Sequence, residues 1–174
     1  DTSDLNAATA TVTITSTTAT FSTDPTSGDG NIGVGDVVQY VMNGTYYVAF
    51  ISGRTSATTF SVQDRAGSTV VTASAGTTVS VYRAYNSLYA WETNIETQVN
   101  SSIDPTVDQL VLMSSIDIAT DDTIMMVPCY ADTATDTVDV FINGWTTGAE
   151  KYIKIYTPTS LSEVGTTQRH SGTW

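Results

Sequence analysis

Positive charge is scarce in this sequence. Six lysines and arginines stand against 18 aspartates and glutamates, which gives a formal net charge of −12 at pH 7. Nucleic acids and anionic lipid surfaces bind proteins through basic patches, so neither is expected as a partner. A basic protein or divalent cations are the partners that this charge allows, and otherwise the acidic surface serves solubility.

Cysteine and long apolar runs are scarce as well. The single cysteine, Cys129, excludes a disulfide within the chain, and its apolar neighbours in residues 124–130 predict a buried side chain. No run of about 18 apolar residues occurs, so a membrane-spanning helix is not expected. Because the chain begins at Asp1 and carries no signal peptide, we expect it to be one part of a longer, processed protein.

Threonine and serine are abundant instead, with 33 and 18 residues respectively. Threonine is β-branched and favours half-exposed strands, so residues 9–83 are predicted to form a small β barrel or sandwich. A mobile arm at residues 1–8 precedes it. Asn43-Gly44 lies between two apolar runs and predicts a hairpin, because both residues accept a positive φ. The expected strands are residues 10–15, 18–22, 37–42, 46–51, 59–63, 68–72 and 77–82.

One helix is expected after this domain, over residues 86–100. Asn86 or Ser87 can cap its first turn, and we expect the helix to cover one end of a β structure. Its apolar stripe at helical spacing consists of Leu88, Trp91, Ile95 and Val99.

Strand-like runs return after the helix, at residues 107–113, 123–130, 137–142 and 151–156. They predict either the first rungs of a right-handed parallel β-helix or a second β-sandwich. No repeat length is visible, so the direction of strand pairing stays open. The predicted fold is therefore all-β with one short helix, and its second domain covers residues 84–174.

Several motifs, taken in order, carry a resemblance to a known family. They lie at residues 51–56, 81–88, 91–92, 143–147, 152–158 and 169–174. The chain resembles the N-terminal region of large secreted parallel β-helix proteins, the pectate-lyase-like surface proteins of environmental bacteria and phages. The resemblance implies an extracellular location and a β-helix that starts near residue 86. It carries no catalytic motif.

No catalytic constellation is recognisable, and we expect no enzymatic activity. The only histidine, His170, lies near the end of the chain. Calcium is the one cofactor that the sequence suggests, because Ca²⁺ takes six to eight oxygen ligands and aspartates cluster near turns. Ordinary turn-forming aspartate is the alternative. The candidate ligands are Asp29, Asp36, Asp121 and Asp122.

Two further sets of residues are candidates for binding. Aromatic side chains in or near turns, namely Trp145, Trp174 and Tyr152, are candidates for contact with a glycan or a partner protein. Val12, Ile14 and Phe21 are candidates for assembly, because an unpaired edge strand can pair with a strand of another chain.

These observations favour an extracellular structural protein of the cell surface. Its copies would assemble into a filament or a surface layer through strand-mediated contacts, and removal of residues 1–22 would abolish assembly. A glycan-binding adhesin or phage tail-type module is the alternative. A fragment of a polysaccharide-processing β-helix enzyme is the third hypothesis.

Overall fold

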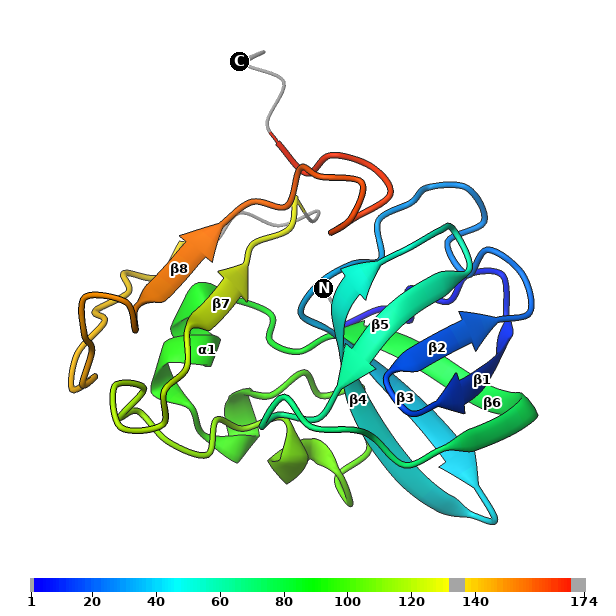
Figure 1. The fold of residues 1–174 in the computed structure, drawn as a ribbon, viewed down its shortest axis with the longest axis horizontal. Coiled ribbons are helices and arrows are strands. Elements are labelled where there is room, and N and C mark those ends of the chain that lie inside the picture. The colour runs from blue at the N-terminus through cyan, green and yellow to red at the C-terminus, as the bar shows by residue number, and fades with distance from the viewer. Residues whose placement is uncertain (1, 132–136, 170–174) are drawn as a thin grey trace.

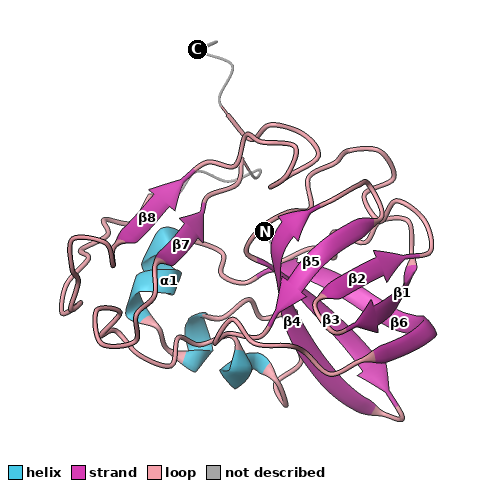
Figure 2. Cartoon of the chain, viewed as in Figure 1, coloured by secondary structure: helices cyan, strands magenta, loops and turns pink. Residues whose placement is uncertain are grey.

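A computed structural model describes residues 2–131 and 137–169 of the chain (Figure 1). Most of its regular structure is β, as predicted, and a closed six-stranded antiparallel barrel dominates the N-terminal half (Figure 2). The barrel strands are Thr11–Thr15 (β1), Thr18–Phe21 (β2), Asp36–Met42 (β3), Thr45–Arg54 (β4), Thr59–Gln63 (β5) and Ala73–Arg83 (β6).

The barrel closes through its last strand. The strands follow one another around it in the order β1-β2-β5-β4-β3-β6, and β6 pairs with both β3 and β1. The predicted hairpin is confirmed, since Asn43 and Gly44 have φ angles of 52° and 78° between the paired residues Met42 and Thr45. The predicted strand at residues 68–72 is absent, because β6 starts at Ala73.

Alternating side chains fill the barrel interior. Val12, Ile14 and Phe21 are at most 3% exposed, and the ring of Phe21 meets that of Phe60 edge-on at 5.6 Å between centroids. β1 and β2 are each paired along both edges. The prediction that these three side chains assemble copies of the chain is therefore wrong, because they form the core of their own barrel.

The first residues of the chain lie against the barrel. Leu5 is 7% exposed, and its N–H donates to the carbonyl of Val81 at 2.8 Å. Asn6 is 5% exposed and donates from Nδ2 to the carbonyl of Val79 at 2.9 Å. Within the mobile arm predicted at residues 1–8, these two residues add to the apolar and polar contacts of β6.

The outer face of β3 is covered as well. Five consecutive residues at its start are buried, a pattern typical of a strand that is covered on both faces. The cover comes from a second apolar cluster that joins Val37 to Val99, Ile103, Val107 and Val111.

The predicted strand at residues 107–113 is wrong. Asp108–Leu110 forms one turn of 3₁₀-helix (η2) instead. This turn places Val107 and Val111, four residues apart, against the same strand of the barrel.

The predicted helix is present but short. It spans Leu88–Thr93 (α1), and Ser87 caps it by accepting a hydrogen bond from the N–H of Ala90 at 3.0 Å. Asn94 ends the helix in the left-handed conformation, at a φ of 47°. Its side chain accepts from the N–H of Met113 at 2.8 Å, and this contact fixes the chain reversal.

The rest of the predicted helical range is therefore not α-helical. Glu96–Gln98 forms a single 3₁₀ turn (η1), and Ile95 is 49% exposed. The apolar stripe predicted from Leu88 to Val99 is wrong beyond Trp91, because the left-handed residue redirects the chain.

A small parallel sheet follows. Met125–Pro128 (β7) pairs with Ile153–Tyr156 (β8), which confirms strands inside two of the predicted runs and shows that they are parallel. Residues 137–142 contain no strand. This is the one strand pair after α1 in the described residues, so the predicted β-helix and the predicted second sandwich are absent from them. Within the same residues, no helix has the length and apolarity to cross a membrane.

Candidate functional site

The four aspartates predicted to bind calcium lie apart. Asp36 is buried against Arg83, Asp29 and Asp121 are exposed, and Asp122 pairs with Lys151 at 2.7 Å. Among the described residues, no three or more acidic, histidine or cysteine side chains group as metal ligands. Calcium binding stays a prediction without a preformed site.

Asp36 instead anchors a buried charged cluster. Nη1 of Arg83 donates to both carboxylate oxygens of Asp36 at 2.7 Å, and the two residues are 5% and 1% exposed. Asp36 also accepts the N–H of Gly33 at 2.9 Å. The ring of Tyr130 lies 3.6 Å from the guanidinium carbon, a cation–π contact. We call these residues the Arg83 cluster.

The Arg83 cluster joins the barrel to the C-terminal half. Tyr130 donates its hydroxyl to the carbonyl of Val34 at 2.7 Å. Gly33 forms a β-bridge with Val164, and a Cβ at Gly33 would overlap the carbonyl oxygen of Glu163. The close approach requires glycine there, and the two halves of the chain pack as one body at this junction.

Trp145 and Tyr152 lie in different surroundings. Trp145 is half-buried and stacks on Trp91 of α1, with centroids 5.5 Å apart and planes inclined by 20°. Much of the ring face that a ligand would contact is therefore covered by Trp91. Tyr152 is 45% exposed, and Trp174 lies outside the described residues. Cys129 is half-buried, whereas burial was predicted.

Most of the exposed large apolar side chains belong to the C-terminal half of the sequence. Apart from Val71, Tyr89 and Ile95, the large apolar residues exposed in the described chain all lie between residues 110 and 161. These residues are Leu110, Ile116, Ile124, Met126, Val138, Phe141, Ile142, Tyr152, Ile155 and Leu161, and we call the four on or next to β7 and β8, namely Ile124, Met126, Tyr152 and Ile155, the C-terminal apolar surface.

β8 adds an open edge to this surface. β7 is bound to the segment that contains β8 through N–H groups of Met125 and Cys129, which donate to the carbonyls of Tyr152 and Tyr156 at 3.1 and 2.7 Å. β8 lies on the outside of the molecule, with no further strand beyond it in the described chain (Figure 1). On β8, Ile155 remains 39% exposed although its neighbour on β7, Val127, is buried. The sheet therefore offers both an apolar face and free backbone groups.

Comparisons of the chain with models of protein families, with characterised proteins and with solved structures find no match. The fold and its surface define the class by themselves: an all-β barrel protein with an exposed apolar surface on its C-terminal half.

Alkaline pH is expected to destabilise this protein through its tyrosines. Burial raises the pKa of Tyr40 and Tyr85 to about 12. Burial, and then the charge of Glu163, raise the pKa of Tyr156 to about 12. Between pH 10 and about 12 the unfolded chain releases these protons while the folded chain retains them. The free energy of unfolding should thus be unaffected by these groups below about pH 10 and fall above it.

Urea denaturation at a series of pH values measures this effect. Tyr85→Phe should flatten the decline above about pH 10, since one fewer proton is released on unfolding. General charge repulsion would act on both proteins alike. A decline with the same slope in the variant would contradict the prediction.

Proposed function

We propose that this chain is an extracellular structural protein whose copies associate through the C-terminal apolar surface and the open edge of β8. The observation that carries the proposal is the open edge of β8 with exposed apolar side chains on and next to it, Ile155 at 39% and Tyr152 at 45% exposure. The proposed assembly contact is β8 and not the N-terminal strands that the sequence indicated.

The closed barrel supports this assignment of roles. Its strands have no unpaired edge, so it offers no site for strand addition. β8 does offer one, and addition of a strand to a free edge is a common mode of protein association. The abundance of threonine and the scarcity of lysine and arginine favour a surface location, as the sequence indicated.

Parallel pairing supports the resemblance to β-helix surface proteins. Met125 pairs with Ile153, 28 residues later, and Asp117 forms a parallel bridge with Thr146 at nearly the same offset. We propose that these segments represent one step of a parallel β stack, with the barrel and α1 at one end and a strand of a second copy beyond β8.

Ile155→Lys is expected to convert associated protein into monomer. The substitution replaces an exposed apolar side chain next to Lys154 by a second charge, so it removes an apolar contact and adds repulsion between copies. Size-exclusion chromatography with light scattering, with and without Ca²⁺, measures the mass, and negative-stain microscopy shows whether the associated form is regular. A shift from oligomer to monomer supports the proposal.

Ile95→Lys is the matched control. Ile95 is an isoleucine with 49% exposure that lies outside the C-terminal apolar surface, so its replacement should leave the oligomer unchanged. A native chain that stays monomeric at every concentration, or equal effects of the two variants, would contradict the proposal.

A further inference from the structure

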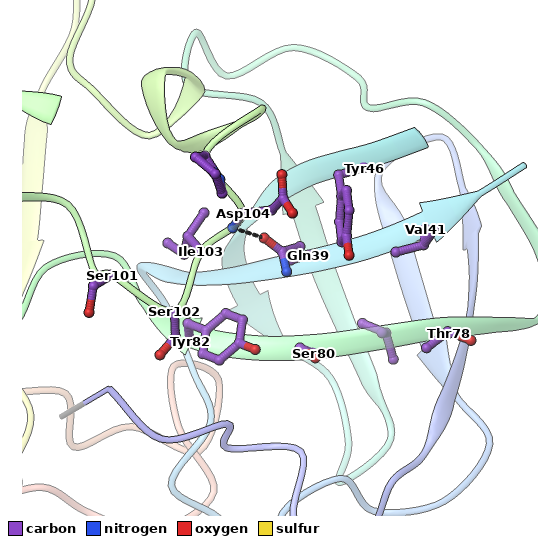
Figure 3. Close-up of a pocket in the computed structure, with 12 residues that line it drawn as sticks. Gln39, Val41, Tyr46, Thr78, Ser80, Tyr82, Ser101, Ser102, Ile103 and Asp104 are labelled. Atoms are coloured by element: carbon purple, nitrogen blue, oxygen red, sulfur yellow. Dashed lines mark hydrogen bonds between the residues drawn. The ribbon is translucent and has the colours of Figure 1, made fainter. Parts of the chain in front are cut away.

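A hollow on the barrel is independent of the assembly surface. It has a volume of about 390 Å³ and lies where the segment at residues 101–105 crosses the outer face of β3 and β6 (Figure 3). Small-molecule sites occupy roughly 300–1,000 Å³. The hollow is therefore large enough for a small ligand, and its lining decides which kind.

Strand register gathers polar groups around one glutamine. Gln39 pairs with Ser80 of β6, and Val41 pairs with Tyr46 of β4 and with Thr78 of β6. Side chains on one face of neighbouring strands are within reach of each other along the diagonals as well. Gln39 therefore lies between the rings of Tyr46 and Tyr82, with the hydroxyls of Ser80 and Thr78 along the same face (Figure 3).

The amide of Gln39 is held in one orientation. Its Oε1 accepts the backbone N–H of Asp104 at 2.7 Å, and this contact requires the oxygen on that side. Nε2 is consequently turned away from Asp104 and toward β6 (Figure 3). Gln39 is 6% exposed as a residue, but its Nε2 is not among the buried side-chain atoms of the described chain that lack a partner, so this donor reaches the solvent of the hollow. A donor held in one orientation at the wall of a hollow can donate to a ligand acceptor in place of water.

The charge of the lining selects among ligands. The hollow is lined by hydroxyls, an amide and two tyrosine rings, and no lysine or arginine of the described chain lines it. Asp104 is its one charged residue, in a protein with a net charge of −12. An anionic ligand would lack a counter-charge and meet repulsion. A neutral molecule with several hydroxyls and an apolar face matches the lining.

We propose that the hollow binds a neutral hexopyranose unit of a glycan. The sugar hydroxyls accept from Nε2 of Gln39 and exchange hydrogen bonds with Ser80 and Thr78, while a C–H face of the ring packs on Tyr46 or Tyr82. The site goes beyond the proposed structural role and differs from Trp145, Trp174 and Tyr152. The strands of the closed barrel hold it, whereas assembly uses β8.

Saturation-transfer NMR tests the site with the methyl glycosides of glucose, galactose and mannose, and with methyl glucuronide as the charged comparison. At least one neutral glycoside should bind, with a Kd on the order of 1 mM, and the glucuronide should not. A separate amide correlation spectrum of the protein should show shift changes only around Gln39, Ser80 and residues 101–105 when the glycoside is added.

Gln39→Glu retains the oxygen that accepts from Asp104 and replaces the donor Nε2 by an acceptor. It should weaken binding about tenfold, which corresponds to about 1.4 kcal/mol. Ser80→Leu fills the hollow without removing a hydrogen bond to Asp104, so it should abolish binding even if the first variant folds poorly. Gln109→Glu, an exposed glutamine elsewhere, should bind as the native chain does.

Any one of four outcomes would overturn the proposal. One is the absence of saturation transfer to every neutral glycoside. The next two are binding that survives Ser80→Leu in a folded protein, and binding of the glucuronide as strong as that of the neutral glycosides. Shift changes near Trp145 or Tyr152 in place of the hollow would also overturn it.

Discussion

Replacement of Arg83 by methionine is expected to lower the free energy of unfolding by about 3–5 kcal/mol, the cost of removing one partner from a buried ion pair. The carboxylate of Asp36, 1% exposed, would be left with the N–H of Gly33 but without its counter-charge. Tyr130 would lose the guanidinium that lies over its ring. Urea denaturation followed by tryptophan fluorescence measures the loss.

An exposed ion pair provides the matched control. Lys151 and Asp122 also approach to 2.7 Å, but the side chain of Asp122 is 84% exposed. Water and salt screen such a pair, so Lys151→Met should cost less than about 1 kcal/mol. The double variant with Arg83→Met and Asp36→Leu should recover much of the loss, because no charge remains unpaired. Equal losses in Arg83→Met and Lys151→Met would refute this account of the junction.

Trp91→Ala is expected to have a comparable effect, about 3–5 kcal/mol, because a large buried aromatic leaves a cavity. Trp91 is 6% exposed and stacks on Trp145. Its removal should also free the turn at residues 143–147, which becomes sensitive to proteases while the barrel stays protected. Thermal unfolding and limited proteolysis measure the two effects.

Tyr89→Ala serves as the control on the same helix. Tyr89 is 39% exposed, so its truncation should change stability by no more than about 0.5 kcal/mol. Trp91→Phe should retain part of the stack and part of the stability. The idea fails if Tyr89→Ala is as costly as Trp91→Ala, or if the turn remains resistant in Trp91→Ala.

Local patterns predicted the barrel well. The Asn43-Gly44 turn and the alternation of Val12 and Ile14 depend only on near neighbours, and both correspond to the structure. The same alternation could not show that β1 is paired along both edges. Closure of the barrel depends on β6, which is distant in sequence. The prediction that β1 pairs with strands of other chains was therefore wrong.

In the chain that follows the barrel, tertiary contacts determine the structure more than local sequence patterns do. Asn94 ends α1 in the left-handed conformation, and its side chain accepts from the N–H of Met113, a tertiary contact that no helical pattern reveals. Residues 107–113 were predicted as a strand because apolar residues return there, although the four-residue spacing of Val107 and Val111 is a helical signal. The five-residue buried start of β3 likewise indicated a second cover on the barrel.

The hollow around Gln39 was not predicted. Its residues come from three strands and a distant loop, and their spacing in the sequence has no regularity. One signal was present, since Gln39 interrupts a strongly apolar strand. A polar residue in a buried strand requires partners, and these partners are known only once the register of β3 with β6 is known.

The closing role of β6 also determines the order in which the protein can fold during synthesis. β1 and β2 leave the ribosome long before Ala73–Arg83, and a two-stranded hairpin alone is marginally stable. β3 and β1 obtain their second neighbour only from β6, whose last residue, Arg83, also brings the counter-charge for Asp36. Until residue 83 is made, the nascent strands have open edges that can pair wrongly. Barrel formation therefore waits until β6 has left the ribosome.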